Sequence, residues 1–96
     1  MTDGLKIMSI GGSTYPYILV GWVEHTRGDE YIVRGARCIR RLGRGQSLAG
    51  LAAHGPYAGE GPTQLLAAAT EELHRLLIRR AIPASEEAWA VECPRP

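Results

Sequence analysis

Residues 17–42, YILVGWVEHTRGDEYIVRGARCIRRL, decide the fold. The run 17–24 is apolar on both faces, which is typical of a central strand. The run 30–42 is long and rich in β-branched residues, which predicts a second strand. The residues between the two runs include Gly28, which can adopt the positive φ of a tight turn. The sequence therefore predicts an antiparallel β-hairpin.

A third strand precedes this hairpin. Residues 5–10 begin as an alternation of apolar and polar side chains, and a glycine pair then ends the run. Together the three strands predict an antiparallel meander. Two interruptions fall inside it. Gly21 predicts a bulge or a close approach of two backbones, and the break in alternation at Gly35-Ala36 predicts a second bulge.

A short helix follows the meander. Ser47 is a good N-cap for a helix over residues 48–54, and Gly55 suits the position just after its end. Pro56 prevents the helix from continuing. The sequence therefore predicts one helix of about two turns, with Ser47 at its beginning.

The next stretch predicts a longer helix. Leucines and alanines in residues 63–75 recur at the i, i+3, i+4 spacing of a helix face. The apolar run 76–82 fits either the end of this helix or a strand, because short apolar runs do not distinguish the two. Residues 85–89 begin a final turn or helix. The predicted fold class is α+β: a small antiparallel sheet of about three to four strands, covered by one short and one longer helical segment.

Length and composition fit one soluble domain over residues 1–96, with residues 93–96 as a tail. The 96 residues are 45% apolar and 22% charged. No run approaches the roughly 20 apolar residues that span a bilayer, and the first residues lack the features of a signal peptide. The two cysteines, Cys38 and Cys93, form no CxxC pair, so neither zinc nor a disulfide framework is expected. These features predict a cytoplasmic protein with no membrane partner.

The residues that carry chemistry are scattered. His25, His54 and His74 have no metal-binding spacing, and nothing in the sequence orients Cys38 and His54 as a thiol dyad. Adjacent glutamates point apart or lie on a solvated face. We therefore expect no catalytic residue, no metal and no cofactor, and hence a protein that is not an enzyme.

Charge is concentrated in the middle of the chain. Residues 31–59 contain five arginines and no acidic residue, although the whole chain carries a net charge of only +1. Guanidinium groups beside glycines and a helix N-terminus favour binding of an anion. Solvated arginines, or arginines paired with glutamates, explain the same pattern. The candidate ligand-binding residues are Arg37, Arg40, Arg41, Arg44, Gly45, Ser47 and Tyr57.

Two segments resemble a family of small phage and prophage proteins of unknown function. They are residues 36–39 (ARCI) and residues 47–55 (SLAGLAAHG), which match a strand ending in Ala-Arg and a Ser-Leu-x-x-Leu-Ala-x-x-Gly pattern. The resemblance covers roughly residues 17–85. Residues 40–42 depart from it, because arginines and a leucine stand where the family has Trp or Tyr. Arg44 also replaces the first glycine of the family's turn.

This resemblance implies a small accessory protein of phage origin that acts in the host cytoplasm by binding host components, without catalysis. It also implies a strand before Pro83. In that setting we expect a non-enzymatic protein that binds an anionic ligand, such as a nucleotide signal in a counter-defence role, through the arginines.

Two other functions fit the same residues. The protein could instead be an inhibitor or assembly component that acts on an acidic host protein, or it could bind nucleic acid, which the acidic flanks of the basic centre disfavour. The surplus of apolar residues over one sheet face predicts a homo-oligomer.

Overall fold

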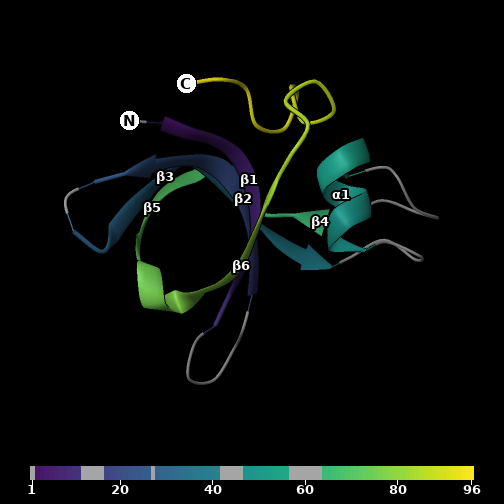
Figure 1. The fold of residues 1–96 in the computed structure, drawn as a ribbon. Coiled ribbons are helices and arrows are strands. Elements are labelled where there is room, and N and C mark those ends of the chain that lie inside the picture. The colour runs from purple at the N-terminus through teal and green to yellow at the C-terminus, as the bar shows by residue number, and fades with distance from the viewer. Residues whose placement is uncertain (1, 12–16, 27, 42–46, 57–63) are drawn as a thin grey trace.

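The structure is a computed structural model that describes residues 2–11, 17–26, 28–41, 47–56 and 64–96, with the backbone alone at positions 2, 3, 40 and 41. These residues form a six-stranded antiparallel sheet with one short helix (Figure 1). The elements in chain order are β1 (Thr2–Ile10), β2 (Tyr17–His25), β3 (Glu30–Arg41), α1 (Leu48–His54), β4 (Gln64–Leu65), β5 (Ala69–His74), the 3₁₀ helix η1 (Arg75–Leu77) and β6 (Ile78–Pro83). The predicted meander is confirmed, since β1 pairs with β2 and β2 pairs with β3.

One continuous segment, residues 69–83, joins the two edges of this meander. Its first part, β5, pairs with β3, and its last part, β6, pairs with β1. Only the three residues of η1 lie between them, and three residues span at most about 11 Å. The two edges therefore approach each other, and the sheet curls into the ring seen in Figure 1. The curl gives the sheet a concave inner face and an outer face.

A bulge interrupts the pairing of β2 with β3. Val20 pairs with Arg37 but Trp22 pairs with Arg34, so two residues of β3 oppose Gly21 alone. Gly35 has a φ of 59°, which only glycine adopts readily. A bulge bends its strand and increases the local twist, which supports the curl of the sheet. Both interruptions predicted from the sequence are thus confirmed at a single place in the fold.

Alternation along the strands divides the apolar residues between the two faces. On β1, Leu5 and Ile7 belong to the outer cluster, whereas Met8 and Ile10 belong to the inner one. The inner cluster consists of Met8, Ile10, Leu19, Val23, Val33, Ala36 and Leu73. The outer cluster consists of Leu5, Ile7, Val20, Trp22, Ile39, Leu51, Ala52, Trp89 and Cys93.

Helix α1 and the C-terminal segment cover the outer face. Ser47 caps α1 as predicted, because its hydroxyl accepts a hydrogen bond from the Gly50 amide at 3.0 Å. The Trp89 indole donates to the Leu51 carbonyl (2.8 Å), and the Trp22 indole donates to the Cys93 carbonyl (3.0 Å). The two indoles thus tie helix, C-terminal segment and sheet together. The tail predicted at 93–96 begins with a buried residue, Cys93.

The predicted α+β fold class is wrong, because residues 64–74 contain strands β4 and β5 in place of a helix. The leucines of this stretch do not share a buried face: Leu73 is buried but Leu66 is 45% exposed. An unpaired edge of β3 would leave its amides and carbonyls without partners, and pairing with β5 satisfies them. The strand alternative for residues 76–82 is confirmed in part, since β6 begins at Ile78 after the 3₁₀ turn.

The close approach at Gly21 gives a first prediction. A Cβ atom at this position would lie 2.5 Å from Val33 Cγ1 and 3.0 Å from Ala36 Cα. We expect Gly21→Ala to lower the free energy of unfolding by about 1–3 kcal/mol, because the strands must move apart to admit the methyl group. Urea unfolding followed by tryptophan fluorescence measures this loss. An unfolding midpoint equal to that of the native chain would contradict the bulge geometry.

Candidate ligand-binding site

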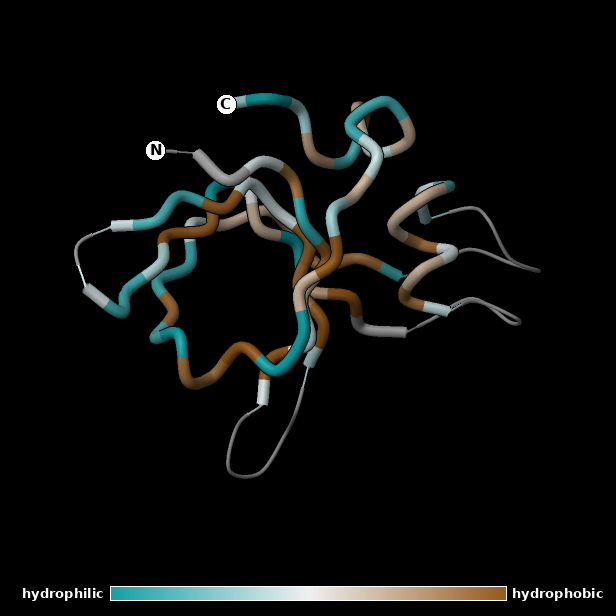
Figure 2. The backbone as a smooth tube through the Cα atoms, viewed as in Figure 1, coloured by the Kyte–Doolittle hydropathy of each residue, from teal (hydrophilic) through white to brown (hydrophobic). Residues whose placement is uncertain are grey.

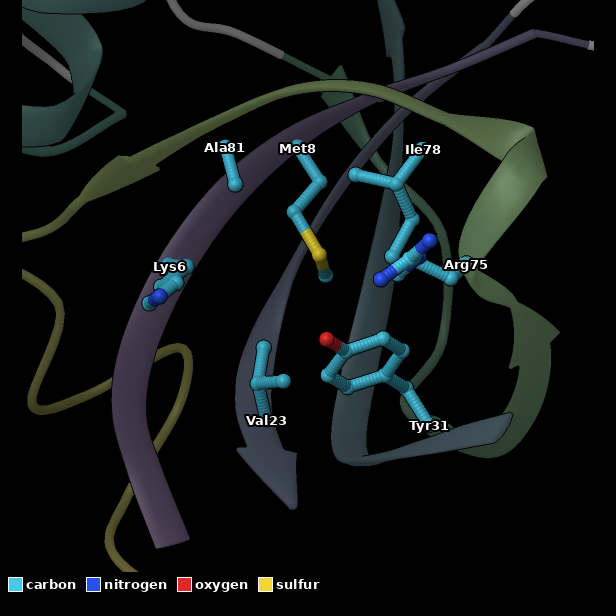
Figure 3. Close-up of a pocket in the computed structure, with 7 residues that line it drawn as sticks. All are labelled: Lys6, Met8, Val23, Tyr31, Arg75, Ile78 and Ala81. Atoms are coloured by element: carbon cyan, nitrogen blue, oxygen red, sulfur yellow. The ribbon is translucent and has the colours of Figure 1, made fainter. Parts of the chain in front are cut away.

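A pocket lies on the concave inner face of the curled sheet. Its volume is about 160 Å³, and β1, β2, β3, η1 and β6 all contribute to its wall. The lining residues are Lys6, Met8, Val23, Tyr31, Arg75, Ile78 and Ala81. Figure 3 shows Met8 and the Tyr31 hydroxyl directed into the pocket, with Lys6 and Arg75 on its two sides. The site therefore combines apolar walls with two cationic side chains.

Lys6 reaches the inner face because of the alternation along β1. It lies opposite Gly21 of β2 and Pro83 of β6, two positions before Met8 on the same face. Lys6 is also the single lysine of the chain. Within the part of the chain that the structure describes, no carboxylate forms an ion pair with its ammonium group. An ammonium group beside apolar walls, without a counter-charge, favours an anion.

Arg75 supplies the second cation, and the hairpin turn holds it in place. Its amide donates to the Asp29 carbonyl at 2.7 Å, and its Nε lies 3.7 Å from Asp29 Oδ1. Both side chains are more than half exposed, so this ion pair contributes at most about 1 kcal/mol. The Arg75 guanidinium can therefore exchange Asp29 for an anion at little cost.

Tyr31 forms the floor between the two cations. Its ring lies 4.9 Å from the ring of His25 at an interplanar angle of 30°. This contact fixes the ring, which leaves the phenolic hydroxyl at the pocket (Figure 3). A hydroxyl can both donate and accept a hydrogen bond, so Tyr31 can position the polar end of a ligand.

Of the arginine-rich site predicted from the sequence, the structure describes Arg37 and Ser47 completely, and both lie apart from this pocket. Arg37 lies opposite Val20 and so projects from the outer face, where its Nε donates to the Leu66 carbonyl at 2.8 Å. The Ser47 hydroxyl accepts from the Gly50 amide. Both side chains thus make structural contacts. The other predicted residues lie outside what the structure describes: these are Arg44, Gly45, Tyr57 and the side chains of Arg40 and Arg41.

Sequence reasoning missed Lys6, Tyr31 and Arg75. The one local signal is at Lys6, a charged residue on the strand face that also carries Met8 and Ile10. Among the described residues, Arg95 pairs with Glu86 at 2.6 Å and Arg34 pairs with Glu24 at 2.7 Å. This pair lowers the pKa of the Glu24 carboxyl through a hydrogen bond and the positive charge of Arg34.

Cysteine and histidine chemistry gains no support from the placement of these residues. Cys38 packs against the inner cluster, whereas His54 ends α1 on the outer side of the sheet, so the two do not form a dyad. The described residues hold no group of three side chains that could bind a metal ion. Their helices, seven and three residues long, are too short to cross a membrane.

Comparison with known proteins gives no identification. No family model, no curated protein and no solved structure matches the chain. Its function must therefore be inferred from the pocket and the surface themselves.

The two cysteines give a second prediction. Burial raises the pKa of the Cys93 thiol to about 11, and the thiolate is the reactive form. We expect a thiol reagent at pH 8 to modify Cys38, which is half-buried, and not Cys93 in the folded protein, and to modify both cysteines in urea.

The raised pKa of Cys93 also makes the stability of the protein depend on pH. An unfolded thiol ionises near pH 9, so the unfolded state loses this proton first and the free energy of unfolding falls as pH rises from 9 towards 11. Rapid modification of Cys93 in the folded protein would contradict its burial.

Proposed function

We propose that the protein binds a small organic anion with an apolar body in the inner-face pocket, and that it does so without catalysing a reaction. The observation that carries this proposal is the Lys6 ammonium group, which lines an apolar pocket beside Met8 and Val23. Such a group recognises a carboxylate or a phosphate by a charge-assisted hydrogen bond. Tyr31 and Arg75 add a hydroxyl and a second cation on the other side.

The size of the pocket limits the ligand. Its volume of about 160 Å³ lies below the roughly 300–1,000 Å³ of sites for drug-sized molecules. A single ring or a short chain with one acidic group fits this volume, whereas a nucleotide would enter only in part. The apolar contacts favour a carboxylate such as benzoate or hexanoate over inorganic phosphate.

The single lysine gives a third prediction. Reductive methylation with ¹³C-formaldehyde labels only Lys6 and the N-terminal amine, so each gives its own NMR signal. We expect titration with benzoate or hexanoate to shift the Lys6 signal and leave the N-terminal signal unchanged. We expect Lys6→Met to weaken binding of the unlabelled protein, measured by calorimetry, by roughly tenfold or more, because one charge-assisted hydrogen bond is lost.

Matched variants separate this site from the arginine-rich segment. Arg34→Gln removes a cation of the outer face and should leave the affinity unchanged. Loss of binding in Arg41→Glu or Arg44→Glu, with binding retained in Lys6→Met, would move the site to residues 34–47 and contradict the proposal. The proposal would also be contradicted if neither benzoate nor hexanoate shifted the Lys6 signal.

Asp29 gives a fourth prediction. Its carboxylate competes with a bound anion for Arg75, which lies 3.7 Å away. We expect Asp29→Asn to strengthen benzoate binding by about two- to fivefold, because an exposed ion pair worth up to about 1 kcal/mol no longer has to be broken. An unchanged affinity in this variant, measured by calorimetry at the same ionic strength, would show that Arg75 does not contact the ligand, and a weaker affinity would contradict the competition.

A further inference from the structure

The η1 turn exposes two leucines to solvent. Leu76 is 79% exposed and Leu77 is 42% exposed, although apolar side chains of this size normally contribute to a core. Figure 2 shows this apolar stretch at the corner of the ring, between hydrophilic stretches of the chain on either side. An exposed apolar centre with a polar rim is the usual composition of a protein–protein interface.

The charges on the two sides of this centre have opposite sign. Before η1, Glu72 lies on the outer side of β5, whereas Glu71 lies on the inner face with Leu73. The adjoining hairpin carries Asp29, which pairs with Arg75, and Glu30 at the start of β3. After η1, β6 carries the exposed pair Arg79 and Arg80. In the described part of the chain, neither these two arginines nor Glu71 and Glu72 form an ion pair.

Both neighbouring strands are also edge strands. Within the segments that the structure describes, β5 pairs only with β3 and β6 pairs only with β1. Each therefore presents unpaired backbone amides and carbonyls along its other side. Such edges favour association with another chain, and the charges beside them determine which chain fits.

We propose that this surface, residues 71–80, binds a second copy of the same chain in a two-fold dimer. A two-fold interface requires a patch that is complementary to itself. Here the leucines of η1 meet at the axis, and Glu72 of each copy faces Arg80 of the other; both residues lie on the outer side of their strands. An anionic lipid surface fits less well, because the carboxylates of Asp29, Glu30 and Glu72 would be repelled by it.

Leu76 provides the first arm of the test. We expect light scattering after gel filtration to give twice the chain mass for the native protein. Leu76→Asp should weaken dimerisation, measured by sedimentation equilibrium, by roughly tenfold or more, because a charge replaces the apolar centre. Val91→Asp is the matched control: Val91 is 87% exposed but lies in the C-terminal segment, and its replacement should leave the dimer intact.

Charge reversal provides the second arm and also reports folding. Glu72→Lys places two positive charges at each charged contact, and Arg80→Glu places two negative charges there, so each variant alone should be monomeric. Mixed in equal amounts, the two should form a heterodimer, because opposite charges then face each other. A variant that fails to fold could not recover binding in this way.

Three results would overturn the dimer. They are a native chain that is monomeric at all concentrations, a dimer that none of these substitutions weakens, and a monomer that binds phosphatidylserine vesicles. Lys6→Met should leave the dimer unchanged, so the dimer and the ligand site are tested independently.

Discussion

The short connection between β5 and β6 constrains the rest of the molecule. Because η1 has only three residues, a segment that pairs with β3 at one end and β1 at the other must draw the two edges of the sheet together. Leu73 and Ile78, on either side of η1, both pack against the inner cluster, which holds the segment in place. The bulge opposite Gly21 lets the strands bend enough for this closure.

The curl explains why one face of the sheet is covered by other segments and the other face lines a pocket. The outer face is filled by α1 and the C-terminal segment, and both tryptophan indoles donate to backbone carbonyls there. On the inner face, apolar residues surround a pocket with Lys6 in its lining, and neither α1 nor the C-terminal segment packs against that side. The same connection leaves Leu76 exposed to solvent. The ligand site and the proposed dimer surface therefore share η1: Arg75 belongs to the ligand site, and the two leucines belong to the dimer surface.

Local signals in the sequence predicted the parts of the fold that local forces determine. The apolar runs of 17–42, the glycines of the bulge and the cap at Ser47 all act within a few residues. Residues 63–75 have helical spacing, but residues 64–65 and 69–74 form strands, because the free edge of β3 is a distant partner that periodicity does not reveal. The pocket was missed for the same reason: Lys6, Tyr31 and Arg75 meet only after the sheet has curled.

NMR measurement of cross-strand contacts is the sharpest test of the curled sheet. The curled sheet predicts nuclear Overhauser effects between Glu71 and Val33 and between Ala81 and Met8 in one molecule, with extended chemical shifts over residues 69–74. Helical shifts over residues 63–75, with neither contact present, would contradict the curled sheet and with it the pocket.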